Sequence, residues 1–83
     1  MNYVYVLKSK KNGQLYVGRT ADLGRRIKQH QAGKTRTTNR LLPLKLIFYE
    51  AFDNKTDAIR REKYFKTSKG KSSLKQIIRN SNI

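Results

Sequence analysis

The chain has 83 residues, of which 20 are Lys or Arg and 5 are Asp or Glu, giving a formal net charge of +15. That length fits one domain and leaves no room for two, so we expect a single domain over residues 1–83 with a basic C-terminal segment over about 67–83. The absence of cysteine excludes a disulfide framework and a thiolate metal site. No apolar run is long enough for a signal peptide or a membrane span, so we expect a cytoplasmic protein with no membrane partner.

The charge balance indicates the class of partner. A surplus of like charge repels itself, and a bound polyanion relieves the resulting loss of stability. Nucleic acid is the polyanion that such basic domains most often bind. A generic basic protein, such as a small ribosomal protein, is one alternative. An anionic membrane surface is a weaker one, because no long basic amphipathic helix stands out.

The chain begins with a predicted β-hairpin. Residues 3–8 are β-branched and aromatic, as strands prefer, and a second strand is expected over residues 15–19. Asn12-Gly13 between them is typical of a two-residue turn, because both residues tolerate positive φ.

A helix is expected next, over residues 22–33. Asp22 or Thr20 can cap its start and Gly33 can end it. Residues 34–43 are polar and basic and should form a loop. Leu44 to Phe52 are rich in Leu, Ile, Phe and Tyr, and we expect them to form the third and central strand of the sheet.

Two more helices are predicted toward the C-terminus. Asn54 or Thr56 can cap a helix that extends to about Lys66, and a shorter helix is expected over 72–80 after a basic linker at 67–71. The resulting order, β-β-α-β-α-α, is that of a small α+β protein whose helices cover a sheet. The C-terminal segment has no acidic residue and is either a nucleic-acid-binding arm or a frayed basic tail.

The first helix places cations beside the core. At 100° per residue, Leu23, Arg26, Ile27 and His30 share one narrow arc. An arginine at the edge of a core needs an anionic partner, and a substrate phosphate is an attractive one because the chain has few acids. Alternatively, Arg26 extends to water and His30 is a cation at the helix C-terminus.

The second helix places an acid among apolar residues. Glu62 shares its inward face with Ala58, Ile59 and Phe65. A carboxylate there is costly unless a salt bridge or a divalent cation compensates it. Mg²⁺ often takes only one or two protein carboxylates and completes its shell with water and substrate phosphate. The alternative is a salt bridge to Arg26, Arg61 or Lys66.

The hairpin brings two tyrosines to one face. With the expected turn, odd positions on the first strand oppose even positions on the second, so Tyr5 and Tyr16 share a face with Gly18 bare beside them. A glycine within a strand often marks close approach by a ligand or by backbone. The two hydroxyls can accept or relay a proton, or the rings simply fill a half-buried sheet face.

Several enzyme classes are excluded by motif. The chain has no Walker loop, no Gly-rich dinucleotide turn and no His-Glu-x-x-His. A single histidine excludes a histidine-cluster metal site, and no pair of carboxylates suits glycosidase chemistry.

The ordered set of these residues resembles a known family. Tyr3-Val4-Tyr5, Tyr16-Val17-Gly18, Arg26, His30 and Arg61-Glu62 follow one another as in the GIY-YIG nuclease superfamily, over about residues 2–80. The resemblance is greatest to short stand-alone bacterial members, which are similar to the N-terminal domain of the excinuclease C subunit. It implies a three-stranded antiparallel sheet flanked by helices, with the site on one sheet face.

The resemblance also implies roles. Tyr16 would act as base or proton relay for the attacking water, with Tyr5 lining the site. Arg26 would stabilise transition-state charge, and His30 would orient a tyrosine or take its proton. Glu62 would hold one Mg²⁺ or Mn²⁺ ion at the leaving oxygen. Many family nucleases carry a further downstream asparagine, for which Asn80 is the candidate.

The resemblance implies a metal-dependent endonuclease acting on nucleic acid, DNA favoured, with a protein partner supplying specificity because no separate DNA-binding domain is attached. The alternative is a non-catalytic DNA- or RNA-binding protein on the same scaffold. Basic residues around the predicted elements are the candidate nucleic-acid contacts: Arg19, Arg25, Lys34, Arg36, Arg40, Lys66, Lys69 and Lys71.

Overall fold

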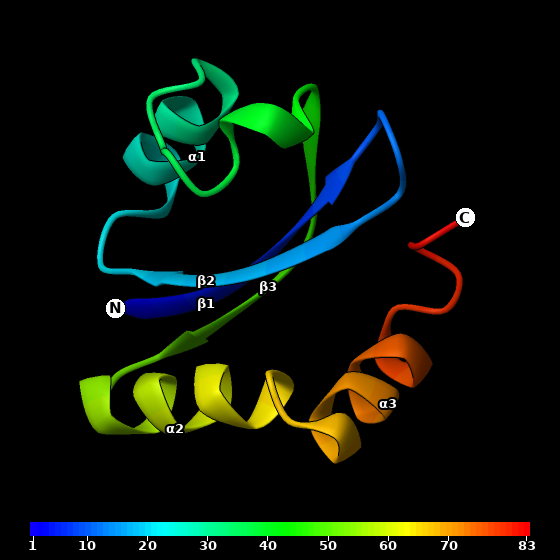
Figure 1. The fold of residues 1–83 in the computed structure, drawn as a ribbon. Coiled ribbons are helices and arrows are strands. Elements are labelled where there is room, and N and C mark those ends of the chain that lie inside the picture. Colours follow the sequence, from blue (N-terminus) through cyan, green and yellow to red (C-terminus); the bar gives the residue numbers. More distant parts are fainter.

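A computed structural model describes residues 1–83 as three layers, with one antiparallel sheet between helices on its two faces (Figure 1). The element order is β-β-α-β-α-α, and both this order and the α+β class confirm the prediction. The bounds are β1 (Asn2–Ser9), β2 (Leu15–Thr20), α1 (Leu23–Gln31), a short 3₁₀ turn (Asn39–Leu41), β3 (Leu44–Phe52), α2 (Lys55–Phe65) and α3 (Ser68–Ile77).

The strand order is β2-β1-β3, so β1 is the central strand and the expectation that β3 is central is wrong. The reason is visible in β1 itself, where Val4, Tyr5, Val6 and Leu7 are all at most 1% exposed. A strand buried on both faces reads as a continuous apolar run. By contrast, only Leu44 of β3 is buried, and the rest of that edge strand is half-buried or exposed.

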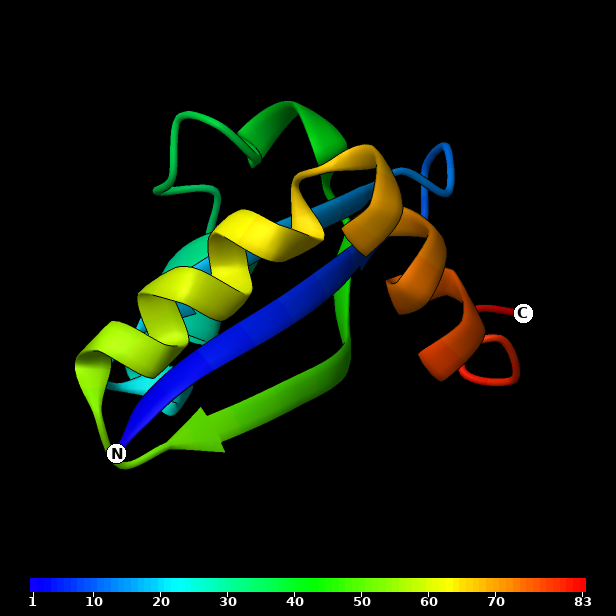
Figure 2. The same ribbon diagram turned by 90° about the horizontal axis from the view of Figure 1, so that it is seen from below.

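Each face of the sheet has its own small core. On one face, Tyr5 and Leu7 pack with Ile27 of α1 and with Leu41 and Leu44. On the opposite face, a second cluster joins β1 to α2 and α3, which follow one another at an angle beneath the sheet (Figures 1 and 2): Val4, Val6, Ala58, Phe65, Leu74 and Ile78. No helix in the structure is both long and apolar enough to span a membrane.

The loop of the hairpin is longer than predicted, but the side chains of its strands point to the predicted faces of the sheet. Ser9 N–H donates to the Gln14 carbonyl, so the connection is longer than a two-residue Asn12-Gly13 turn, although Gly13 does adopt the positive φ of 78°. Tyr5 pairs with Gly18 and Leu7 with Tyr16. Odd positions still oppose even ones, because lengthening the loop by two residues preserves the alternation of side chains.

The C-terminal segment is neither an arm nor a frayed tail. A helix begins at Ser68, within the predicted linker, because the Thr67 side chain caps it by accepting from the Gly70 N–H. Leu74 and Ile78 are nearly fully buried beneath the sheet. The segment is thus a structural helix whose exposed side is basic.

Candidate active site

A buried hydrogen-bond chain runs from the central strand into the loop after α1. The Tyr5 hydroxyl lies 2.7 Å from Nε2 of His30, and the other ring nitrogen, Nδ1, lies 2.7 Å from Oγ1 of Thr38. His30 and Thr38 are fully buried and Tyr5 is 1% exposed. The imidazole therefore has both nitrogens engaged and a fixed ring orientation.

Gly18 makes room for the Tyr5 ring. A Cβ atom on Gly18 would overlap Cζ and Oη of Tyr5. The Tyr5 ring therefore packs against β2 at a position that has no side chain. Tyr16 lies two residues from Gly18 on β2 and points to the same face of the sheet as Tyr5, as predicted. Its ring centroid is 6.4 Å from that of Tyr5 and 5.4 Å from that of His30. Tyr16 is half-buried and Tyr5 is enclosed.

Burial dominates the electrostatics of this chain. It lowers the pKa of His30 below its ordinary value of 6.5, and the positive charge of Arg26 lowers it further. His30 is therefore neutral at pH 7, and its interpretation as a cation at the helix end is wrong. Burial also raises the pKa of Tyr5; Arg26 opposes that rise, whereas the charges of Tyr16 and Glu62 add to it.

Arg26 is half-buried and has no carboxylate partner. Its guanidinium donates to Oε1 of Gln29, at 3.1 Å. None of the four salt bridges in the structure includes it. A guanidinium in this position keeps donors available for an anion that comes from outside the chain.

Glu62 reaches the site from the opposite layer. It lies on α2, beneath the sheet, whereas Tyr5 and Tyr16 face α1, so the site straddles the edge strand β2 and does not lie on one sheet face. Its side chain is 20% exposed and is not solitary: Oε1 lies 3.4 Å from Arg19 Nε and Oε2 lies 3.0 Å from Lys66 Nζ. Of the predicted salt-bridge alternatives, the one to Lys66 is present.

Arg61, adjacent in sequence, has a different role. Its guanidinium binds the Glu50 carboxylate through two hydrogen bonds, of 2.8 and 3.1 Å, and lies over the Phe65 ring. This pairing raises the pKa of Arg61, mainly through the Glu50 hydrogen bond. Arg61 therefore joins α2 to β3 and contributes nothing to the Glu62 site.

The donor set at Glu62 suits one kind of metal ion. No group of three or more His, Cys, Asp or Glu residues is close enough together to enclose a metal. One partly exposed carboxylate, such as that of Glu62, fits a hard cation that takes one protein carboxylate and completes its shell with water and phosphate. Glu62 is the residue that would hold it.

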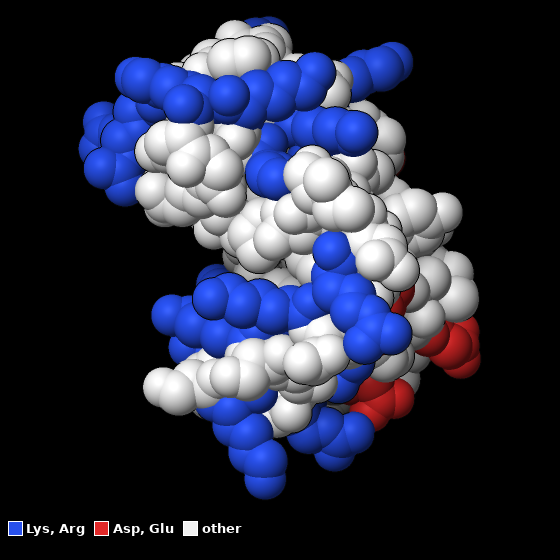
Figure 3. All heavy atoms as spheres, turned by 90° about the vertical axis from the view of Figure 1, so that its right-hand side faces the viewer, with Lys and Arg blue, Asp and Glu red and all other residues white.

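Cations surround the site above and below. Figure 3 shows the molecule hollowed between two basic lobes, one formed around α1 and its following loop and the other around α2 and α3, with the visible acids to one side. Arg19 is half-buried and pairs with Glu62, whereas the other predicted nucleic-acid contacts are all exposed: Arg25, Lys34, Arg36, Arg40, Lys66, Lys69 and Lys71.

Two residues differ from the site residues predicted from the sequence. Thr38 was not predicted, because a threonine in a polar loop carries no pattern and only the fold brings it to His30. Asn80, the candidate for the downstream asparagine, lies exposed beyond the end of α3.

Known proteins resemble this chain over most of its length. A sequence profile described as the GIY-YIG catalytic domain matches residues 1–76. The UPF0213 protein SAG0778 of Streptococcus agalactiae serotype V is 40% identical over 96% of this chain and 91% of its own length. The UPF0213 protein CPE1444 of Clostridium perfringens is 46% identical over 80% of this chain and 71% of its own. A solution NMR structure of the UPF0213 protein BH0048 from Bacillus halodurans is similar, with a TM-score of 0.58, 38% identity and coverage of 93% and 85% of the two chains.

Proposed function

Because this chain belongs to the GIY-YIG family of nuclease domains, we propose that it is a metal-dependent endonuclease that hydrolyses phosphodiester bonds in nucleic acid, with DNA as the favoured substrate. One observation supports this most strongly. The Tyr5 hydroxyl of β1 lies 2.7 Å from His30 Nε2 on α1, and the Tyr16 ring of β2 lies 5.4 Å from the His30 ring. Arg26, also on α1, has no carboxylate partner.

Tyr16 is the proposed proton acceptor. Its ring is half-buried, so its hydroxyl can meet water, whereas burial raises the pKa of Tyr5 and disfavours its ionised form. The water oxygen bonds to phosphorus while the bond to the leaving oxygen breaks. The water proton passes to the Tyr16 oxygen while the Tyr16 hydroxyl gives its own proton to bulk water, and the leaving oxygen takes a proton from bulk water.

His30 and Thr38 hold Tyr5 in place. With Nδ1–H donating to Thr38 Oγ1, Nε2 accepts the Tyr5 proton in a hydrogen bond. Arg26, which has no acid partner, binds the equatorial phosphate oxygens as their negative charge grows. Preorganised charge of this kind acts strongly because the enclosed groups need no reorganisation.

Nucleases of this family generally use a divalent metal. We propose that Glu62 holds one Mg²⁺ or Mn²⁺ ion, which when bound supplies positive charge at the leaving oxygen. Arg19 and Lys66 flank the carboxylate and supply further positive charge to the phosphates on either side. The proposed compartment is the cytoplasm, and a protein partner is proposed to supply specificity.

The test is cleavage of supercoiled plasmid and branched DNA with Mg²⁺ or Mn²⁺. We expect Glu62→Ala, Tyr16→Phe and Arg26→Ala each to lower cleavage at least about 100-fold while binding persists. Matched controls outside the site, Asp57→Asn, Tyr49→Phe and Arg60→Ala, should keep activity, because these side chains are exposed or pair only with each other. Cleavage that survives Glu62→Ala or needs no metal would refute the mechanism.

A non-catalytic nucleic-acid binder is the second candidate. The observation that favours it is that both Glu62 oxygens already have a cationic partner, which competes with a metal ion. This function predicts salt-sensitive binding with no turnover under any metal. The same assay therefore separates the two.

A further inference from the structure

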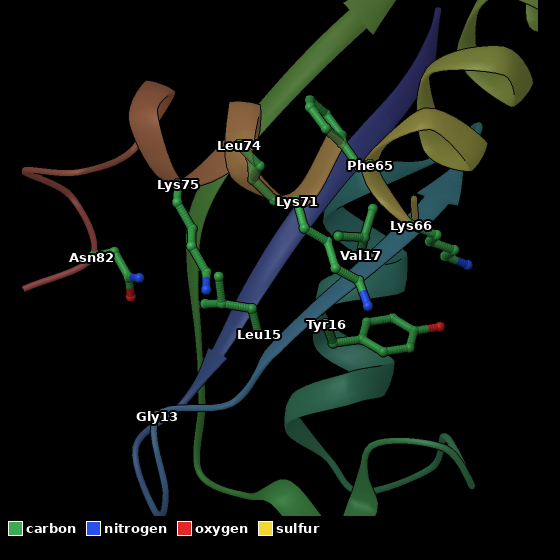
Figure 4. Close-up of a pocket in the computed structure, with 10 residues that line it drawn as sticks. All are labelled: Gly13, Leu15, Tyr16, Val17, Phe65, Lys66, Lys71, Leu74, Lys75 and Asn82. Carbon is green, nitrogen blue, oxygen red and sulfur yellow. The ribbon is translucent and has the colours of Figure 1, made fainter. Parts of the chain in front are cut away.

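A cavity beside the catalytic cluster lies between the edge strand β2 and the C-terminal helices. Its volume is about 580 Å³, within the range of small-molecule sites. Figure 4 shows its apolar lining, to which β2 contributes Leu15 and Val17 and the opposite wall contributes Phe65 and Leu74. The walls belong to well-packed elements, so the cavity is a fixed feature of the fold.

The rim of this cavity is cationic. Lys66, Lys71 and Lys75 line it, and no carboxylate does. Lys71 and Lys75 have no salt-bridge partner, and Figure 4 shows their side chains extending from α3 toward β2. An apolar interior beneath free ammonium groups is complementary to a ligand that combines a flat apolar body with an anionic group.

The lining also contains an unsatisfied acceptor. Oδ1 of Asn82 is buried and has no hydrogen-bond partner. A buried acceptor without a donor is costly, so rotation of the Asn82 side chain toward a cavity ligand that supplies an N–H group would be favoured. The exocyclic amine of a nucleobase is such a donor.

The cavity is continuous with the catalytic cluster. Tyr16 lines it, and Lys66 lines it while also binding Glu62. We propose that this cavity receives the base of an unpaired nucleotide next to the scissile phosphate, so that the substrate is a strand with an unpaired nucleotide at or near a junction. The proposal rests on the proposed function, because it needs the phosphate to lie at Tyr16.

The chemistry of the cavity favours an unpaired nucleotide over a neutral peptide strand or a phosphate alone. A base within a duplex is stacked on both sides, whereas an unpaired base offers a free face to an aromatic ring such as that of Tyr16. A neutral peptide added to the edge of β2 would leave the lysine rim without an anion. A phosphate alone would leave the apolar walls unused.

The experiment is a binding titration in EDTA, where cleavage cannot interfere. The probes are three labelled DNAs: a blunt duplex, the same duplex with a five-nucleotide single-stranded overhang, and that overhang with abasic nucleotides. We expect the intact overhang to bind roughly 5- to 100-fold more tightly than either other probe, the range measured for one stacked base. Equal binding of the intact and abasic overhangs would overturn the proposal.

Variants test whether the preference for the intact overhang depends on this cavity. Asn82→Ala, near the chain end, should reduce the intact-to-abasic ratio without unfolding the protein. The double variant Lys71→Ala/Lys75→Ala should weaken binding of the overhang and lower the salt slope by about one to two. Lys55→Ala/Lys63→Ala removes the same charge from exposed sites on α2 that do not line the cavity, and should preserve the overhang preference.

The outcomes separate the two proposals. An overhang preference without cleavage under any metal would refute the nuclease function and leave the cavity as the base-binding site of a non-catalytic binder. Cleavage with no overhang preference would refute the cavity alone. Displacement of the overhang by a neutral strand peptide, with no loss in the lysine variant, would assign the cavity to a peptide and overturn the proposal.

Discussion

His30 is held between two hydroxyls inside the protein, and this makes stability depend on pH. Burial lowers its pKa in the folded state below 6.5, so the unfolded chain binds the proton more readily. The stability that neutral His30 contributes is thus fully present above pH 6.5 and is lost as the pH falls from 6.5 toward the lowered pKa. The free energy of unfolding, measured by urea denaturation between pH 7.5 and 5.5, should show this decline. His30→Asn should make it less dependent on pH, and the same pH dependence in both proteins would contradict the prediction.

Thr38 is a positioning residue that acts through His30. Thr38→Val keeps the shape but leaves Nδ1 of His30 without a partner, at a cost of about 1–3 kcal/mol. Thr38→Ser retains the hydroxyl and should restore both stability and the His30 titration measured by NMR. A merely steric role would make serine, which lacks the methyl group, the worse replacement.

Gly18 and Gly24 provide a matched pair of substitutions. Gly18→Ala should displace the Tyr5 ring, lower cleavage at least about tenfold and destabilise the fold by about 1–3 kcal/mol. Gly24→Ala, on α1 with nothing within 4 Å of the added Cβ, should stabilise it by about 0.5–1 kcal/mol. Thermal denaturation and plasmid cleavage measure both; unchanged cleavage in Gly18→Ala would contradict the ring's placement.

Single residues differed in how well the sequence predicted them. The shared face of Tyr5 and Tyr16 was predictable, because side-chain alternation survives an error of two residues in the turn. The salt bridge from Arg19 to Glu62 was not, since its partners lie far apart in sequence and meet only across the sheet edge. The catalytic roles themselves stay predictions.

At the scale of the elements, an irregularity in β3 sets which residues reach each core. The register shifts between Val6 and Leu7, which pair with Phe48 and Leu46 respectively. This bulge turns Leu44 and Leu46 toward α1, whereas Phe48 packs on the opposite side. The sequence of β3 reads as a plain apolar strand, so neither the bulge nor its edge position could be predicted from it.

The junction of α2 and α3 depends on one glycine. A Cβ on Gly70 would overlap the Tyr64 carbonyl, which is backbone and cannot move aside without shifting α2. Gly70→Ala should therefore cost about 3 kcal/mol or more, separate α3 from Phe65 and enlarge the cavity. Chemical denaturation measures the loss, with Gly24→Ala as control; a loss below about 1 kcal/mol would show that the helices can readjust.

For the molecule as a whole, the net charge of +15 dominates behaviour in solution. The structure contains only four salt bridges, so most cations repel one another at low ionic strength. Raising KCl from about 0.02 to 0.2 M shortens the Debye length from roughly 20 to 7 Å. The melting temperature should rise over this range while DNA affinity falls; a melting temperature that falls with salt would contradict a repulsive surface.

Placing the carboxylate of Glu62 beneath the sheet has a consequence for the order of assembly. Residues 1–52 carry both tyrosines, the imidazole and the Arg26 guanidinium, but the acid arrives only with α2. An emerging polypeptide that has formed the strands and α1 holds the cationic half of the centre alone. Under the proposed mechanism, a chain that still lacks α2 cannot cut a polynucleotide, so scission waits until translation has delivered the final third.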